Sequence, residues 1–188
     1  RIVEEALEEG RTVYGVNTGF GKMSDARIGP DRIEELQENL ILSHAAGLEP
    51  VASPQTAALV VALRAHSLAL GNSGVTPALV ERLAELFNSS VVPVIPEVGS
   101  VGASGDLAPL AQLGAVLLGR GPAMHFDGER EIRRSVRTPY RFRAKEALSL
   151  INGVQFSSAV LAETLVGAEE ALVLADVAAA MSLEALKG

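Results

Sequence analysis

The chain has 188 residues, of which 48% are apolar and 4% aromatic, so it can bury one sizeable and mainly aliphatic core. Its formal net charge of −7 argues against nucleic acid as a partner, and the absence of cysteine excludes disulfides and thiolate chemistry. Three well-separated histidines do not favour a metal site, and without a signal peptide or an apolar run of membrane-spanning length we expect a soluble, cytoplasmic protein with no membrane partner.

The N-terminal half of the sequence predicts helices separated by turns. The expected elements are a helix at 1–9, an extended segment at 12–16, a loop at 17–21, and helices at about 30–46, 53–70 and 76–88. Asp31 and Glu34 form a capping pattern, and Pro54 and Pro77 stand where the first helical turn admits proline. We expect Arg64, on the helix at 53–70, to form a structural ion pair.

The most distinctive stretch is Gly99-Ser-Val-Gly-Ala-Ser-Gly-Asp-Leu-Ala-Pro109, which places a glycine at every third position around Ser104. It lies between an extended run at 91–96 and a helical pattern at 107–118. Glycine permits backbone conformations that other residues rarely reach, and the N-terminus of a helix supplies free N–H groups and a partial positive charge. The segment is therefore a tight turn whose backbone can take part in chemistry.

Three common motifs do not fit this chain. A nucleophile elbow would need glycine at the position of Asp106, and a dinucleotide fingerprint would need a different glycine spacing. A P-loop would need Ser or Thr after Gly21-Lys22, where Met23 stands. Taken alone, the stretch at 99–109 is an ordinary turn, with Asp106 as the N-cap of the next helix.

The C-terminal part begins with a break at 119–122 and a polar stretch that holds six arginines in the fourteen residues 130–143. On an acidic chain this pattern favours a solvated or intersubunit ion-pair surface. Asn152-Gly153 interrupts the following helical pattern, and 156–186 is one long helix that is apolar on more than one face, as in a buried bundle.

The predicted fold is mainly α, with a short β and loop region. We divide the chain into an N-terminal domain at 1–150, which carries the Ala-Ser-Gly loop, and the beginning of a central helical bundle at 151–188.

Residues 99–110 closely resemble the signature of the aromatic amino acid ammonia-lyases, the histidine-specific members above all. The resemblance implies that Ala103-Ser104-Gly105 cyclises, with attack of the glycine nitrogen on the alanine carbonyl carbon and loss of two waters. The product is the electrophile 4-methylidene-imidazol-5-one (MIO). Small residues permit the required compression, and preorganised proximity can contribute roughly 7–11 kcal/mol. The resemblance also implies that Asp106 assists ring formation.

The segment from Tyr14 to Gly21 matches a second motif of the same family. By itself Tyr14 reads as a half-buried strand residue, but the resemblance implies that it is a catalytic base on a mobile loop. A phenol with the ordinary pKa of about 10 is a poor base at neutral pH, so this role needs a positive neighbour or a helix dipole.

The segment Leu42–Gly47 resembles the histidine-specific form of the position that sets substrate choice. Without this resemblance His44 is a core residue, because it shares one helix face with Leu40. The resemblance implies that Ser43 and His44 bind the substrate. A neutral imidazole can exchange a hydrogen bond with an imidazole substrate, which leucine cannot do.

The segment Lys145–Gln155 is a further family-like element. The resemblance implies that Asn152 contacts the substrate carboxylate and that Gln155 lies close by. Val154 departs from the family, which usually has threonine there.

The resemblance as a whole implies a cytoplasmic homotetramer that eliminates ammonia from L-histidine and yields trans-urocanate, with MIO and without a metal or nucleotide. Family members are much longer and place a second tyrosine, an arginine and a glutamate downstream, so we expect this chain to be the N-terminal portion. One alternative is a tyrosine or phenylalanine ammonia-lyase or 2,3-aminomutase, against which Ser43 and His44 argue. Another is an inactive fragment that only folds and associates. Attack by the substrate amine and attack by its aromatic ring remain open.

Overall fold

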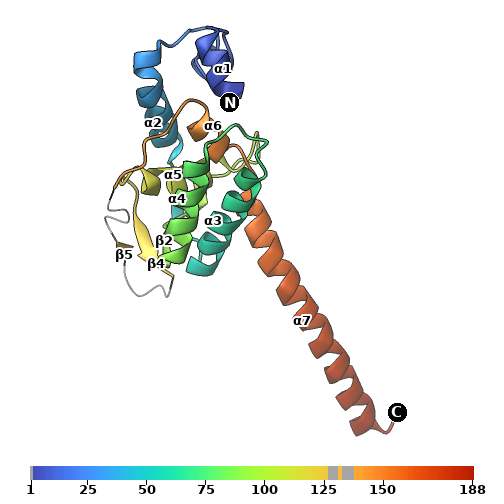
Figure 1. Cartoon of the computed structure of the whole chain (residues 1–188). Helices are drawn as coiled ribbons and strands as arrows, with labels where there is room; N and C mark the ends of the chain where they lie inside the picture. Colours follow the sequence, from blue (N-terminus) through green and yellow to red (C-terminus); the bar gives the residue numbers. More distant parts are fainter. Residues whose placement is uncertain (1, 127–130, 133–137) are drawn as a thin grey trace.

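The structure is a computed structural model that describes residues 2–126, 131–132 and 138–188. The α-helices are α1 (Ile2–Glu8), α2 (Ile33–His44), α3 (Pro54–Ala69), α4 (Pro77–Asn88), α5 (Leu107–Leu117), α6 (Glu146–Ile151) and α7 (Gln155–Leu186). The 3-10 helices are η1 (Gly21–Met23) and η2 (Pro30–Arg32), and the strands are β1 (Leu48–Val51), β2 (Val91–Pro93), β3 (Pro96–Val98), β4 (Ala123–His125) and β5 (Glu131–Ile132). The fold is mainly α, as predicted, and α7 leaves the body as a long rod (Figure 1).

The core lies among α2 to α6, and α5 contributes more buried residues to it than any other helix of the described chain. A Cβ atom added at Gly114 of α5 would lie 2.9 Å from Ile41 Cγ2 on α2, so these two helices approach closely. The predicted starts of α3 and α4 are confirmed, with Pro54 and Pro77 in their first turns. Ser53 caps α3, since its Oγ accepts a hydrogen bond from the Thr56 N–H at 3.0 Å.

The strands form two small antiparallel sheets, β1–β3 and β2–β4–β5. In the first sheet Leu48 pairs with Val98, and in the second Val92 pairs with Met124. The β1–β3 pair brings the chain that follows α2 next to the chain that enters the glycine-rich turn.

Two local predictions near the N-terminus are wrong. Residues 12–16 are not extended but turn, because the Asn17 side chain accepts from the Val13 N–H at 2.8 Å and donates to the Arg11 carbonyl at 2.8 Å. Asp31 does not cap α2, since η2 precedes the helix and Arg32 takes the N-cap position without a side-chain cap bond.

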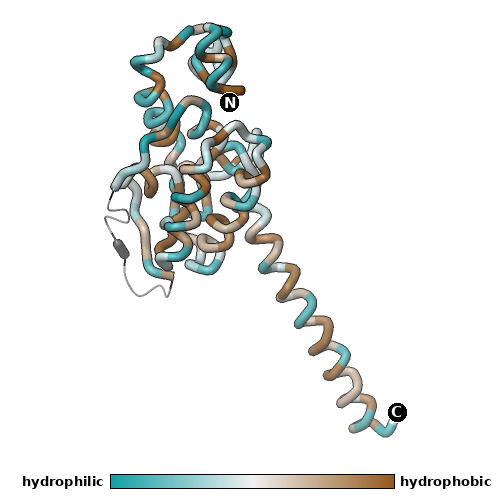
Figure 2. The backbone as a smooth tube through the Cα atoms, in the orientation of Figure 1, coloured by the Kyte–Doolittle hydropathy of each residue, from teal (hydrophilic) through white to brown (hydrophobic). Residues whose placement is uncertain are grey.

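The predicted break at Asn152-Gly153 is confirmed, because α6 ends at Ile151 and α7 begins at Gln155. The predicted burial of α7 in a bundle is not seen within this chain. Beyond Ala159 the side chains of α7 are exposed, and apolar and polar residues alternate along the helix (Figure 2). The exposed large apolar side chains of α7 are Val160, Leu161, Leu165, Val166, Leu172, Val173, Leu174, Val177, Met181, Leu183 and Leu186. In the described part of the chain no helix could span a membrane.

The arginine-rich stretch falls mostly outside the described residues, which include only Arg141 and Arg143 of the six arginines. Both are exposed, and Arg141 Nε lies 3.7 Å from Glu34 Oε1 on α2.

Candidate functional site

The glycine-rich turn joins β3 to α5 in a conformation that few residues adopt. Gly102 and Gly105 have φ angles of +66° and +115°, and Ser104 between them has φ of +62°. A left-handed backbone is uncommon for serine and is often found at functional sites, where the surrounding structure holds the strain. Ala103 and Ser104 are exposed, whereas Gly105 and Asp106 are buried. The serine thus stands at the surface on a turn whose C-terminal side is fixed.

Gly105 lies directly against Gly153, in the break between α6 and α7. A Cβ atom added at Gly105 would lie 2.6 Å from the Gly153 carbonyl oxygen and 2.7 Å from its nitrogen, so only glycine fits. The next residue strengthens this contact, because the Asp106 N–H donates to the Gly153 carbonyl at 2.6 Å. The structure therefore brings together two segments that the sequence analysis singled out separately.

Asp106 occupies the N-cap position of α5, but its side chain makes no cap bond there, so its predicted role as a cap of α5 is wrong. The carboxylate instead accepts three other hydrogen bonds. Oδ1 accepts from Ser100 Oγ at 2.8 Å and from Ser157 Oγ at 2.7 Å, and Oδ2 accepts from the Ser157 N–H at 2.8 Å. Because the side chain is only 1% exposed, it ties the start of the turn to the first turn of α7.

Arg64 of α3 is also part of this site, and the prediction that it forms an ion pair is wrong. Its guanidinium donates from Nη1 to Gln155 Oε1 at 2.8 Å and from Nη2 to the carbonyls of Asn152, at 3.1 Å, and Ser149. Across the described residues no Asp or Glu pairs with it. Burial lowers the pKa of Arg64 to about 10.

The segment that follows α2 meets the start of the turn. A Cβ atom added at Gly99 would lie 3.1 Å from the Ala46 carbonyl oxygen and 3.4 Å from the Gly47 Cα, two and three residues after His44. His44 Nδ1 lies 2.8 Å from the Leu40 carbonyl oxygen, which can only accept. This contact assigns the proton to Nδ1 in the neutral ring and leaves Nε2 as an acceptor.

Ser43 lies next to this imidazole. Its hydroxyl donates to the Leu40 carbonyl at 3.0 Å, and its Oγ lies 3.1 Å from His44 Nδ1.

Tyr14 lies on the turn that Asn17 holds, and its side chain is 53% exposed. Its hydroxyl accepts from the Gly21 N–H at 3.4 Å, and its ring packs edge-on against Phe20 with centroids 6.1 Å apart. The neighbouring Gly15 packs against Leu148 of α6, one turn before Asn152. The expectation of a half-buried strand residue is wrong, and the turn is linked to the rest of the site through α6.

Helix α6 is held by two buried polar side chains. Glu146 accepts four hydrogen bonds, among them from the Thr76 hydroxyl at 2.7 Å and the Tyr140 hydroxyl at 3.0 Å. Gln37 of α2 accepts from the Ala147 N–H at 3.0 Å. Burial raises the pKa of Tyr140 to about 12; the charge of Glu146 acts in the same direction, and the hydrogen bond with Thr76 opposes it.

The site therefore joins the Ala103-Ser104-Gly105 turn, the break at 152–155 and the end of α2. Sequence reasoning missed Ser100, Ser157 and the role of Arg64. A charged residue on the otherwise apolar α3 was a signal for Arg64, whereas nothing in the local sequence marks the two serines as partners of Asp106.

The full length of the chain, residues 1–188, matches the family model described as aromatic amino acid lyase. The chain is 44% identical over 191 residues to histidine ammonia-lyase of Aliivibrio fischeri and 43% identical over 192 residues to that of Vibrio cholerae. In both comparisons 100% of this chain is covered, and it spans only 38% of the relative.

Solved structures give the same result. The crystal structure of histidine ammonia-lyase from Trypanosoma cruzi matches with a TM-score of 0.90 at 40% identity, over 100% of this chain and 37% of that one. Tyrosine aminomutase from Streptomyces globisporus matches with a TM-score of 0.76 at 38% identity, over 84% of this chain and 30% of that one.

Proposed function

This chain belongs to the aromatic amino acid lyase family, and we propose that it is the segment of a histidine ammonia-lyase that forms the electrophile. We also propose that this segment recognises the imidazole of the substrate. The reaction is the elimination of ammonia from L-histidine to give trans-urocanate. The observation that carries the proposal is the convergence of two family-like segments on the strained turn, which is a third: Gly105 rests on Gly153, and Gly99 rests on Ala46 and Gly47, just after His44.

The residues of the turn fit the MIO group. Cyclisation needs the Gly105 nitrogen held near the Ala103 carbonyl carbon, and the positive φ angles of Ser104 and Gly105 fold the chain back in a turn of small residues. The contact with Gly153 leaves no room for a side chain at Gly105. When formed, the group supplies an electrophile that activates the substrate for loss of ammonia.

We assign Tyr14 as the base that removes the β-proton of the substrate. Its ring is exposed on a turn tied down by Asn17 and braced by Phe20, so it can face a bound substrate.

We assign substrate recognition to Ser43, His44, Asn152 and Gln155. With its proton on Nδ1, His44 presents the Nε2 lone pair to an imidazole N–H. Asn152 is exposed beside the turn and can donate from its amide to the substrate carboxylate, while Gln155 is fixed by Arg64. A site built around such a hydrogen bond rejects analogues that lack it.

A second candidate is a lyase or 2,3-aminomutase for tyrosine or phenylalanine, which the likeness to tyrosine aminomutase favours. Ser43 and His44 favour histidine over phenylalanine, because a phenyl ring offers no partner to the imidazole of His44, whereas the hydroxyl of tyrosine can donate to Nε2, so the substrate assay decides between histidine and tyrosine. The exposed apolar surface of α7 supports association with further copies of the protein, and the family resemblance implies that the assembly is a cytoplasmic homotetramer. The same surface would also make an isolated, inactive fragment associate.

The test is to express the protein at the full length of its natural gene and measure ammonia release from L-histidine, L-tyrosine and L-phenylalanine. We expect activity with histidine and a mass deficit of two waters at Ala103-Ser104-Gly105 in a peptide map. Ser104→Ala should remove both. Preference for tyrosine or phenylalanine would refute the substrate, and an unmodified tripeptide in an active enzyme would refute the electrophile.

A further inference from the structure

The Arg64 guanidinium lies in an unusual environment for a buried cation. The residue is 3% exposed, and its three hydrogen-bond acceptors are two backbone carbonyls and one amide oxygen. Its Nε is buried without a partner in the described part of the chain. Burial of a charge without an opposite charge is costly, and a neutral donor could satisfy helix-end carbonyls at a smaller cost.

The guanidinium of Arg64 hydrogen-bonds to the break between α6 and α7. Ser149 lies before the break, Asn152 lies in it, and Gln155 is the first residue of α7. The planar guanidinium of Arg64 therefore hydrogen-bonds to residues on both sides of the break. A Cβ atom added at Gly153 would lie 2.9 Å from Arg64 Cζ and would contact Nη1 and Gln155 Oε1. The guanidinium thus packs directly on the Gly153 backbone.

The glycine-rich turn packs on the other side of the Gly153 backbone. Its carbonyl accepts from the Asp106 N–H at 2.6 Å, and a Cβ atom at Gly105 would lie 2.7 Å from its nitrogen. Arg64, Gly153 and Gly105 therefore form a continuous stack in which no atom can be added between neighbours. A displacement of Gly153 would be passed to the nitrogen of Gly105.

We propose that Arg64 is a positioning residue for the cyclisation of Ala103-Ser104-Gly105. It fixes Gly153, which in turn holds the Gly105 nitrogen against the Ala103 carbonyl carbon. This inference rests on the proposed function, because it assumes that the tripeptide forms the ring. Arg64 takes no part in the bond changes and donates all its hydrogen bonds to the break.

The reaction that it assists is balanced within the tripeptide. The Gly105 nitrogen bonds to the Ala103 carbonyl carbon, and its proton moves to the Ala103 oxygen. That oxygen leaves as water with the proton of the Ser104 nitrogen, which gives a C=N bond. The Ser104 hydroxyl leaves as a second water with the Ser104 Cα proton, which gives the exocyclic C=C bond. No oxidant or reductant is needed.

The test uses the full-length protein with Arg64→Lys, which keeps the charge but loses the fork, and Arg64→Met, which loses every donor. The readout is the fraction of the tripeptide that has lost two waters, followed by peptide mass spectrometry over time after synthesis. We expect ring formation to slow by roughly 10–100-fold in Arg64→Met and by less in Arg64→Lys, since a misplacement of about 1 Å has an effect of this size. The oligomeric state should stay at the wild-type value.

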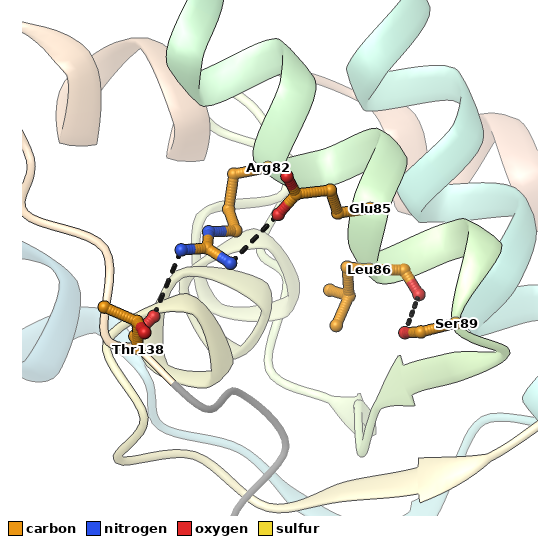
Figure 3. Close-up of polar contacts among 5 residues, drawn as sticks. All are labelled: Arg82, Glu85, Leu86, Ser89 and Thr138. Carbon is orange, nitrogen blue, oxygen red and sulfur yellow. Dashed lines mark hydrogen bonds and ion pairs between the residues drawn. The ribbon is translucent and has the colours of Figure 1, made fainter.

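Arg82→Met on α4 is the matched control. Arg82 also donates to a backbone carbonyl, that of Thr138 at 3.3 Å, and pairs with Glu85 at 3.0 Å, but it has no contact with the break (Figure 3). It should form the ring at the wild-type rate.

Wild-type rates of water loss in both folded Arg64 variants would overturn the inference and leave the proposed function intact. Unfolding of both variants would also overturn the inference, because Arg64 would then act on stability alone. If only Arg64→Met unfolds, the rate of water loss in Arg64→Lys decides. An unmodified tripeptide in the wild-type protein would instead refute the proposed electrophile, and the inference with it.

Discussion

The buried carboxylate of Asp106 gives the sharpest prediction, because it holds α7 and not the helix that it precedes. Asp106→Asn keeps an acceptor for the hydroxyls of Ser100 and Ser157 but turns an NH₂ group toward the Ser157 N–H, which now lies 2.8 Å from Oδ2. Loss of this charge-assisted hydrogen bond, with the partly buried Ser157 N–H left unpaired, costs about 1.5–3 kcal/mol. Asp106→Ala leaves all three donors unpaired and should cost about 3–5 kcal/mol.

Hydrogen exchange of backbone amides measures this effect locally. In Asp106→Asn the amides of residues 155–158 should exchange roughly 10–100-fold faster, since about 1.4 kcal/mol corresponds to a factor of ten. The amide of Leu110 in the first turn of α5, which donates to the Asp106 carbonyl at 3.1 Å, should keep its protection. Glu81→Gln on α4 is the control, because this exposed side chain loses the same charge without a contact to the turn.

The opposite pattern would refute the reasoning. If the Leu110 amide lost protection and the amides of 155–158 did not, Asp106 would support the start of α5 and not that of α7. We also expect slower water loss at the tripeptide in Asp106→Asn, because the turn is no longer anchored to α7.

Three further predictions concern specificity, pH and packing. His44→Leu should lower activity on histidine relative to phenylalanine by at least about 100-fold, because Nε2 no longer accepts from the substrate; an unchanged preference for histidine over phenylalanine in the three-substrate assay would exclude His44 from recognition of the imidazole. Tyr140 has its folded pKa raised above the ordinary 10 to about 12, so its stabilising contribution is complete below pH 10 and is lost as the pH rises through 12. Tyr140→Phe should therefore be less stable than wild type by about 1 kcal/mol at pH 8, and urea unfolding should show the difference shrinking above pH 10; a constant difference would contradict the pKa shift. Gly114→Ala gains about 1 kcal/mol of helix propensity but forces a methyl group against the buried Ile41, which costs about 1–3 kcal/mol. Thermal unfolding should therefore show a net loss of stability of up to about 2 kcal/mol. A clear gain in stability would mean that Ile41 moves aside.

The sequence alone determined the elements whose signals are local. Pro54 and Pro77 start α3 and α4, and Asn152-Gly153 separates α6 from the long α7. Periodicity and caps act over one or two turns, so they can be recognised without knowledge of the fold. The family-like segments could be recognised in the same way, because the chemistry of a tight turn depends on adjacent residues.

Only the tertiary structure decided the partners of the polar groups. Asp106 sits at an N-cap position but bonds Ser157, 51 residues away, and Arg64 bonds Gln155, 91 residues away. The turn at 12–16 formed instead of a strand because Asn17 satisfies its backbone groups. A buried donor or acceptor must find a partner wherever the packed helices place one, and that choice depends on segments distant in the sequence, which no local pattern encodes.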